Sequence, residues 1–132
     1  MIAHIVLNVQ NFSRSEAFYD RLLPDLGYSG NYCEEGDGYS AKCYRQEASP
    51  SPDLLIKCEA SAEHKVFVRE IGLDHLAFKA ESRDAVDLIF KKLSLAGVTI
   101  TRPPAQYPEY SADYYAFYFR DPDGIPLEVA YC

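Results

Sequence analysis

The sequence predicts an α+β fold made of two modules, each with the element order βαβββ. Three observations support this prediction. The order of one strand, one helix and three strands is indicated in the first half and again in the second. A strand histidine and a helix-ending glycine recur at nearly the same spacing, His75 after His4 and Gly97 after Gly27. A composition of 48% hydrophobic and 14% aromatic residues suits a folded chain rather than a disordered one.

The first module opens with a β-branched segment at 2–9 that predicts a strand. Ser13 followed by Glu16 forms a capping box, so a helix is expected to start at Ser13 and to end at Gly27. Its apolar stripe consists of Phe18, Leu22 and Leu26. Turn-forming sequences at 36–38 and 49–52 then separate three short predicted strands, at about 28–33, 39–44 and 54–58.

The second module repeats this order. A strand is expected at 73–78, and Ser82 is expected to cap a helix that ends at Gly97. The apolar stripe of this helix consists of Ala85, Val86, Ile89, Leu93 and Ala96. The remaining sequence predicts strands at about 98–101, 114–119 and 126–131, a Pro-rich loop at 102–110 and a turn at 121–124.

The length of 132 residues suits one domain, which we expect to span 1–132. Within it, module one is expected at about 1–59 and module two at about 72–132. The charged segment at about 60–71 is then a linker, and His64 within it is expected to be exposed to solvent.

Charge and composition exclude several classes of partner. The chain has 13 Lys and Arg against 20 Asp and Glu, a formal net charge of -7, and its basic residues do not cluster. We therefore expect no nucleic acid partner and no membrane partner. The chain lacks a signal-peptide pattern, an apolar run of about 18 residues and a C-x-x-C motif, so a cytoplasmic protein with reduced thiols is expected. Dinucleotide, nucleotide and serine-hydrolase motifs are also missing.

Strand periodicity places two histidines and a glutamate on the strand faces that do not pack on helices. His4 alternates with the apolar side chains of 5–9, His75 with Leu76, and Glu128 with Leu127. If those faces are concave, the three side chains converge. Two imidazoles and one carboxylate suit a divalent first-row cation and leave positions open for water and substrate. The residues alone leave open a second interpretation, in which each histidine is bonded to a backbone carbonyl.

The whole chain resembles the vicinal oxygen chelate superfamily, which includes glyoxalase I, fosfomycin-resistance thiol transferases, extradiol dioxygenases and bleomycin-resistance proteins. The resemblance rests on the βαβββ repeat, on a strand histidine in each half, and on the Phe-Tyr and Leu-Gly-Tyr sequences at 18–19 and 26–28. Its most specific part is the closing D-P-D-G-x-x-L-E pattern at 121–128.

The resemblance implies curled mixed sheets that form a metal-binding cleft, with metal ligands near the ends of the first and last strands of each module. On this chain those positions are His4, His75 and Glu128, which are the residues that strand periodicity also selects. The implied cofactor is a divalent metal ion, with zinc, nickel, manganese and iron all compatible with this ligand set. The resemblance also implies a homodimer, because many members complete their clefts across a subunit boundary.

The fourth ligand position departs from part of this family. Leu55 aligns with Glu128 and stands where members similar to glyoxalase I carry a second carboxylate, which argues against glyoxalase I activity. Glu59 has the same strand parity but lies too far along the strand to substitute. Lys57 shares the face of Leu55, and both are candidate substrate-binding residues. Among the tyrosines of the second half, Tyr115 is the candidate for substrate contact, although periodicity does not decide which strand face meets the cleft.

Two function classes follow from these predictions. The leading hypothesis is a metal-dependent enzyme acting on a small oxygenated molecule, as a lyase, an isomerase or a ring-cleaving dioxygenase. The alternative is a non-catalytic protein of the bleomycin-resistance type, which binds an aromatic or cationic small molecule without metal. The sequence identifies neither the substrate nor a general base.

Overall fold

The computed structural model describes residues 2–47, 51–61, 63 and 67–132, and of Tyr32 the backbone alone. The chain divides into two compact units, Met1–Val66 and Phe67–Cys132. Within the described residues each unit contains one α-helix and one four-stranded mixed sheet, in the order βαβββ. The predicted α+β class and the two βαβββ modules are therefore confirmed.

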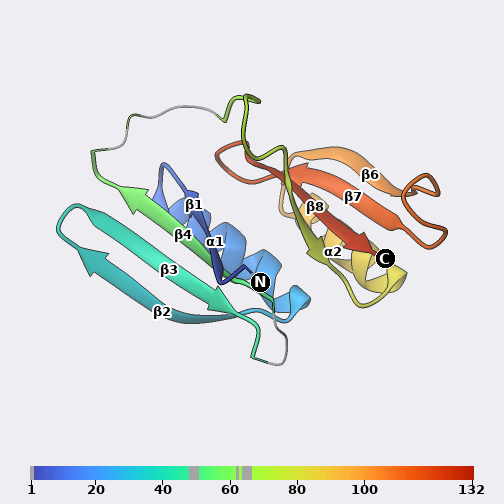
Figure 1. Ribbon diagram of the computed structural model, residues 1–132, viewed down its shortest axis with the longest axis horizontal. Helices are drawn as coiled ribbons and strands as arrows, with labels where there is room; N and C mark the ends of the chain where they lie inside the picture. Colours follow the sequence, from blue (N-terminus) through green and yellow to red (C-terminus); the bar gives the residue numbers. More distant parts are fainter. Residues whose placement is uncertain (1, 48–50, 62, 64–66) are drawn as a thin grey trace. The chain divides into compact units, whose positions relative to one another are not determined.

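The first unit contains β1 (His4–Asn8), α1 (Phe12–Leu22), the short 3-10 helix η1 (Leu23–Leu26), β2 (Ser29–Gly36), β3 (Tyr39–Arg45) and β4 (Asp53–Glu59). The strand order in its sheet is β1-β4-β3-β2 (Figure 1). β1 runs parallel to β4, and the other neighbours are antiparallel.

The second unit contains β5 (Leu76–Lys79), α2 (Arg83–Leu95), β6 (Ile100–Gln106), β7 (Tyr115–Arg120) and β8 (Pro126–Tyr131). Its strand order, β5-β8-β7-β6, repeats that of the first unit, with β5 parallel to β8. In both units the first and last strands of the module are therefore neighbours, which places the ends of these two strands side by side.

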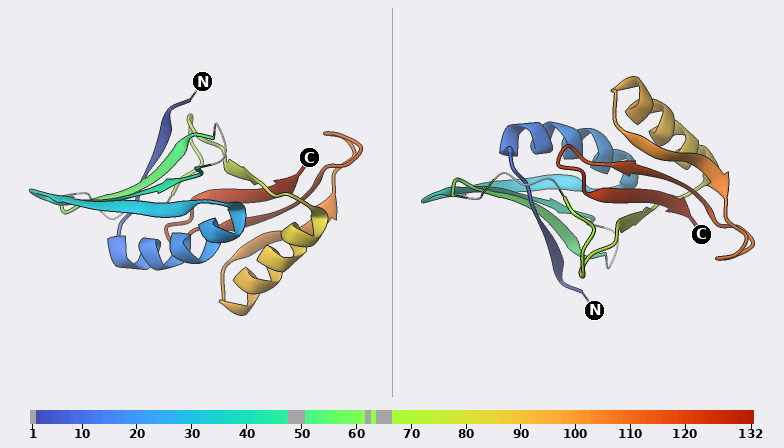
Figure 2. Two further views of the ribbon diagram at one scale, coloured as in Figure 1. Left: turned by 90° about the horizontal axis from the view of Figure 1, so that it is seen from below. Right: turned by 90° about the horizontal axis from the view of Figure 1, so that it is seen from above.

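The helix of each unit covers one face of its own sheet (Figure 2). α1 contacts β3 and β4, and α2 contacts β6, β7 and β8. The predicted stripe of the first helix and Val86, Ile89 and Leu93 of α2 are buried against the strands, each fully buried side chain contributing about 1.5–3 kcal/mol. The predicted stripe of α2 is too wide, because Ala85 is only half-buried and Ala96 is exposed. The side chains of Leu7 and Val9 are buried, whereas His4 and Asn8 are exposed, as strand periodicity predicts.

The N-terminus of α1 corrects one prediction. The N-cap is Asn11, whose Oδ1 accepts a hydrogen bond of 2.9 Å from the Arg14 N–H, and Ser13 lies inside the first turn. The capping box with Glu16 does not form, because this carboxylate instead pairs with Lys42 Nζ of β3 at 3.0 Å. The ion pair with Lys42 therefore prevents Glu16 from forming the capping box that the local sequence predicts.

Three strand boundaries also differ from prediction, and the first is β2, which extends to Gly36 rather than ending near residue 33. The segment 102–106, expected as part of a Pro-rich loop, belongs to β6. β6 is an edge strand with register shifts around Arg102, and an edge strand tolerates Pro103 and Pro104 because it has unpaired N–H positions. β5 begins at Leu76 rather than three residues earlier, so His75 lies immediately before the strand.

The first helix, predicted to end at Gly27, is α-helical only to Leu22 and continues as η1 to Leu26. The predicted ends of α2 agree with the structure. Ser82 caps α2 by accepting a hydrogen bond of 3.1 Å from the Ala85 N–H, and Gly97 follows the helix with a φ of 76°. All four cysteines are free thiols. No helix among the described residues has the length and apolar character needed to cross a membrane. His64 and residues 49–50 of the predicted turn lie outside the described residues.

We expect Asn11→Ala to lower the free energy of unfolding by about 1 kcal/mol, because the Arg14 N–H loses its side-chain acceptor. Ser13→Ala, the matched control, should change it by a few tenths at most. Chemical denaturation monitored by circular dichroism measures both. A larger loss for Ser13→Ala than for Asn11→Ala would contradict the observed cap.

Candidate functional site

A tight turn formed by the D-P-D-G pattern positions β8. Asp121 is buried, and its Oδ1 accepts hydrogen bonds from the N–H groups of Asp123 at 2.9 Å and Ile125 at 2.8 Å. Gly124 has a φ of 86°, in the left-handed region that favours glycine. The pattern returns the chain from β7 into β8, and so determines where Glu128 enters the sheet.

Glu128 and His75 meet on the face of the second sheet opposite α2. The parallel register places Ala77 beside Glu128, and His75 comes two positions before Ala77. His75 Nε2 lies 3.0 Å from Glu128 Oε2. The histidine side chain is 37% exposed and the glutamate side chain 2% exposed, so the pair extends from the interior of the unit to its surface.

The second imidazole nitrogen contacts another carboxylate. His75 Nδ1 lies 2.7 Å from Asp74 Oδ2, and the pKa of Asp74 is lowered by this hydrogen bond and by the positive charge of Arg69. The imidazole ring is therefore held between two carboxylates. An acceptor on Nδ1 favours the tautomer that leaves the Nε2 lone pair available.

Two tyrosines of the second unit complete the surroundings of Glu128. The Tyr114 hydroxyl donates a hydrogen bond of 2.8 Å to Glu128 Oε1, and the Tyr118 ring meets the His75 ring edge-on at 6.1 Å. Burial raises the pKa of both hydroxyls, and the nearby Glu128 raises both further. These tyrosines are therefore neutral hydrogen-bond donors beside the carboxylate at physiological pH.

The His75–Glu128 pair supplies two atoms of the kind that bind divalent first-row cations. One is an imidazole nitrogen and the other a carboxylate oxygen, and the structure brings them within 3.0 Å of each other. A carboxylate on Nδ1 is the usual support for a metal-binding histidine, and Asp74 provides it. Within each unit, however, the described residues include no group of three His, Cys, Asp or Glu side chains able to hold a metal ion. A third ligand would have to join the pair.

His4 occupies the equivalent position in the first unit. There Val6 lies beside Leu55 in the parallel register, as Ala77 lies beside Glu128 in the second unit. His4 precedes Val6 by two positions and is exposed on the face of its sheet away from α1. The two histidines therefore match in the two modules, but Leu55 stands where the second module has its carboxylate.

Lys57, like Leu55, lies on β4 on the face away from α1. Its Nζ pairs with Glu59 Oε1 at 2.7 Å and lies 5.0 Å from the centre of the Tyr39 ring. The side chain is 34% exposed, so the ammonium group lies over the ring and remains partly open to solvent. Lys57 can thus present a positive charge on this face only with Glu59 beside it.

Tyr115 lies on the face of its sheet that α2 covers. Its hydroxyl donates to Asp87 Oδ1 at 2.8 Å, and the Arg83 guanidinium lies 5.5 Å from its ring centre. It therefore faces away from Glu128, which Tyr114 and Tyr118 contact instead. The buried Phe117 and Phe119 share the face of Tyr115; this apolar alternation could have indicated which tyrosines face α2.

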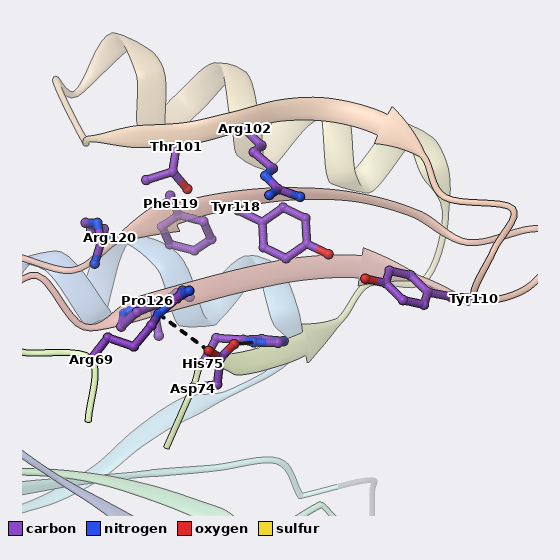
Figure 3. A pocket seen from close by; sticks show the side chains of 11 residues that line it. Arg69, Asp74, His75, Thr101, Arg102, Tyr110, Tyr118, Phe119, Arg120 and Pro126 are labelled. Carbon is purple, nitrogen blue, oxygen red and sulfur yellow. Dashed lines mark hydrogen bonds and ion pairs between the residues drawn. The ribbon is translucent and has the colours of Figure 1, made fainter. Parts of the chain in front are cut away.

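A cavity of about 380 Å³ opens beside this group of residues in the second unit. His75 and Tyr118 line it together with Arg69, Arg102 and Arg120 (Figure 3). Sequence reasoning did not select any of these arginines, nor Asp74. Their contribution depends on the strand register and on the chain segment that leads into β5.

In the metal-free protein, the hydroxyls of Tyr114 and Tyr118 should titrate above the ordinary tyrosine pKa of about 10. A pKa raised in the folded state stabilises the fold below about pH 10, and this contribution is lost as the pH rises through the folded pKa. Glu128→Gln should lower both pKa values, because the neighbouring negative charge is removed. NMR titration of 13C-labelled tyrosine, assigned with Tyr114→Phe, measures this effect; identical titrations in the two proteins would contradict the contact.

Comparison with known proteins places this fold in one family. The family model described as Glyoxalase/Bleomycin resistance protein/Dioxygenase superfamily matches residues 1–129. An uncharacterized protein, YqjT of Bacillus subtilis (strain 168), is 31% identical over 128 residues, which cover 96% of this chain and 94% of the relative.

Solved structures show the same fold. A glyoxylase/bleomycin resistance protein/dioxygenase domain from Frankia sp. EAN1pec has a TM-score of 0.82 at 24% identity, covering 99% of this chain and 96% of that one. A glyoxalase/bleomycin resistance protein from Albidiferax ferrireducens T118 has a TM-score of 0.75 at 25% identity, covering 100% and 98%. The fosfomycin resistance protein FosX from Listeria monocytogenes, solved with Mn(II) and sulfate, has a TM-score of 0.70 at 16% identity, covering 100% and 92%. The chain belongs to the Glyoxalase/Bleomycin resistance protein/Dioxygenase superfamily, the vicinal oxygen chelate family that its sequence resembles.

Proposed function

We propose that this protein is a metal-dependent enzyme in which His4, His75 and Glu128 bind one divalent cation. The observation that carries the proposal is the His75 Nε2–Glu128 Oε2 separation of 3.0 Å, with Asp74 on the far side of the imidazole. The matching position of His4 in the first module supports its inclusion as the third ligand. Zinc, nickel, manganese and iron(II) all suit two imidazoles and a carboxylate.

The proposed cation would polarise a substrate oxygen and stabilise negative charge that develops on it. The chain's own residues prepare the site. Asp74 orients the His75 ring, and Tyr114 holds Glu128 by donating to the oxygen atom that does not face His75. This division leaves Glu128 Oε2 and His75 Nε2 facing each other, 3.0 Å apart. The substrate is a small oxygenated molecule, and the reaction is that of a lyase, an isomerase or a ring-cleaving dioxygenase.

We further propose that the protein is a cytoplasmic homodimer, and that Leu55 and Lys57 contribute to substrate binding from the first module. Membership of the superfamily supports the dimer, because many members complete their clefts across a subunit boundary. Lys57 supplies a positive charge on the face that carries His4. For Tyr115 we propose a supporting role, since its contacts with α2 hold β7 in place. FosX, a structural neighbour with the same fold, was solved with Mn(II).

The alternative function is metal-free binding of an aromatic or cationic small molecule. The cluster of aromatic rings around Tyr107 supports it, since the Tyr110 ring stacks on Tyr107 at 6.0 Å and the Tyr118 ring meets it edge-on at 5.7 Å. A measurement of metal binding distinguishes the two functions, because the proposed enzyme requires a bound cation and the alternative binding protein does not.

The wild-type protein should bind one divalent cation per chain. His75→Ala and Glu128→Gln should each weaken binding at least 100-fold, roughly the effect of removing a charged or imidazole ligand from a three-residue set. His4→Ala should have a similar effect, and His64→Ala, which removes the histidine outside the proposed set, should have none. Isothermal titration calorimetry with metal analysis measures this, and circular dichroism checks folding.

A wild-type protein that stays metal-free after incubation with zinc, nickel, manganese or iron(II) under non-oxidising conditions would exclude the enzyme and favour the binding protein. If His4→Ala binds the cation as tightly as the wild type does, the assignment of His4 as third ligand is wrong, while His75 and Glu128 remain candidate ligands.

Asp74→Asn should weaken cation binding roughly 10- to 100-fold without abolishing it, because the imidazole keeps its donor atom but loses its orienting carboxylate. Glu70→Gln removes the same charge from an exposed neighbouring position and is the matched control. Equal affinities in these two variants would show that Asp74 acts only through its charge.

A further inference from the structure

The cavity beside His75 is positively charged in a chain whose net charge is -7. Three arginines line it, Arg69, Arg102 and Arg120, against one carboxylate, Asp74. Apart from His75, the other lining residues carry no formal charge. Concentrating cations in one cavity of an acidic protein creates a local potential that attracts anions.

Arg102 supplies a cation without a neutralising partner. It lies beside Tyr118 in the register of β6 and β7, and Tyr118 lies beside Glu128 in turn. The guanidinium carbon lies 5.7 Å from the Tyr118 ring centre. Across the part of the chain that the structure describes, no carboxylate pairs with Arg102. Stacking on a ring fixes the guanidinium plane and leaves its edge, with the N–H donors, available to a ligand.

Arg120 lies two positions after Tyr118 on β7 and therefore on the same face. Its Nη1 donates a hydrogen bond of 2.7 Å to the Gly124 carbonyl, which anchors the side chain at the turn before β8. A guanidinium has five N–H donors, so this single bond leaves donors for a ligand. Among the described residues, Arg120 too lacks a carboxylate partner.

Arg69 is the one lining arginine that faces an acid. Its Nε lies 3.5 Å from Asp74 Oδ1, but the two side chains are 69% and 63% exposed, so the pair is weak. The other oxygen of Asp74 is occupied by His75. With three arginines and one aspartate, the residues that line the cavity therefore have a net formal charge of +2 when His75 is counted as neutral.

We infer that the cavity binds a doubly charged oxyanion through Arg102 and Arg120, with Arg69 at its edge. Two unneutralised guanidinium groups match a dianion in charge, and their paired N–H donors match the oxygen atoms of such a group in geometry. As a statement about the substrate, this inference rests on the proposed function: the reacting molecule would carry a phosphate-like or dicarboxylate group and place it beside the His75–Glu128 pair.

Titration of the full-length protein with sulfate or with malonate, at constant ionic strength, tests the inference. Sulfate represents a tetrahedral dianion and malonate a dicarboxylate, and nitrate represents a singly charged anion. We expect one of the two dianions to bind to one site per chain at least tenfold more tightly than nitrate. NMR of the arginine Nε–H groups and isothermal titration calorimetry measure the binding.

Arg102→Gln should weaken binding of the preferred dianion at least tenfold, because a charged hydrogen-bond donor is lost. Lys91→Gln removes one positive charge from an exposed position of α2 outside the cavity and should change it less than twofold. Arg120→Lys keeps the positive charge but removes the planar pair of N–H donors. It should weaken dianion binding while the protein stays folded. Absence of dianion binding, or equal effects of Arg102→Gln and Lys91→Gln, would overturn the inference.

The same titration in Glu128→Gln, and in wild type with and without manganese, separates this inference from the proposed function. Dianion binding that depends on Arg102 in a protein that binds no metal supports the anion site and rejects only the metal centre. Metal binding without dianion binding rejects the anion site and leaves the metal centre standing. Dianion binding that requires manganese and is unchanged in Arg102→Gln would place the anion on the metal and overturn the inference.

Discussion

The candidate site depends on one buried carboxylate. Glu128 is 1% exposed on the central strand β8, and a charge withdrawn from water in this way is costly unless other groups compensate it. The Tyr114 hydroxyl donates to one of its oxygen atoms, and His75 Nε2 lies 3.0 Å from the other. Since Glu128 is flanked by β5 and β7, whatever holds β8 in register also holds the carboxylate in position. The D-P-D-G turn, with Asp121 as its internal acceptor, serves this purpose.

The two modules share a backbone but differ in their chemistry. Both have the same strand order and the same parallel register between first and last strands, so His4 and His75 match, as do Leu55 and Glu128. In the second module, His75 contacts Asp74, Glu128 and Tyr118, and Tyr114 contacts Glu128. The first module has an apolar side chain at the carboxylate position and carries its charged side chains elsewhere. Lys42, for example, is bound between Glu16 and Asp20 of α1 on the helix-covered face.

The second sheet also separates its charges along one face. Glu128 is negative and enclosed, whereas Arg102 and Arg120 lie on the same face at the cavity, stacked on Tyr118 or anchored to Gly124. Tyr118 lies between the two regions, with Glu128 beside it on β8 and Arg102 beside it on β6. A cation at the carboxylate and an anion at the arginines would each reduce the charge left on this face, so the proposed cofactor and the inferred ligand are electrostatically compatible.

The sequence by itself determined the features that depend on local chemistry. Alternation along the strands showed that His4 and Glu128 point away from the helices, and Ser82 and Gly97 marked the ends of α2, because caps and strand faces follow from neighbouring residues. Tertiary structure decided the rest. The ion pair with Lys42 replaced the predicted capping interaction of Glu16. The position of β6 at the edge of its sheet allowed it to contain prolines. Strand register selected Tyr114 and Tyr118 over Tyr115, and brought Arg102 and Arg120 to the cavity with Asp74. These outcomes depend on which strands become neighbours, and contacts between distant segments are set by the packing of the whole unit rather than by any local pattern.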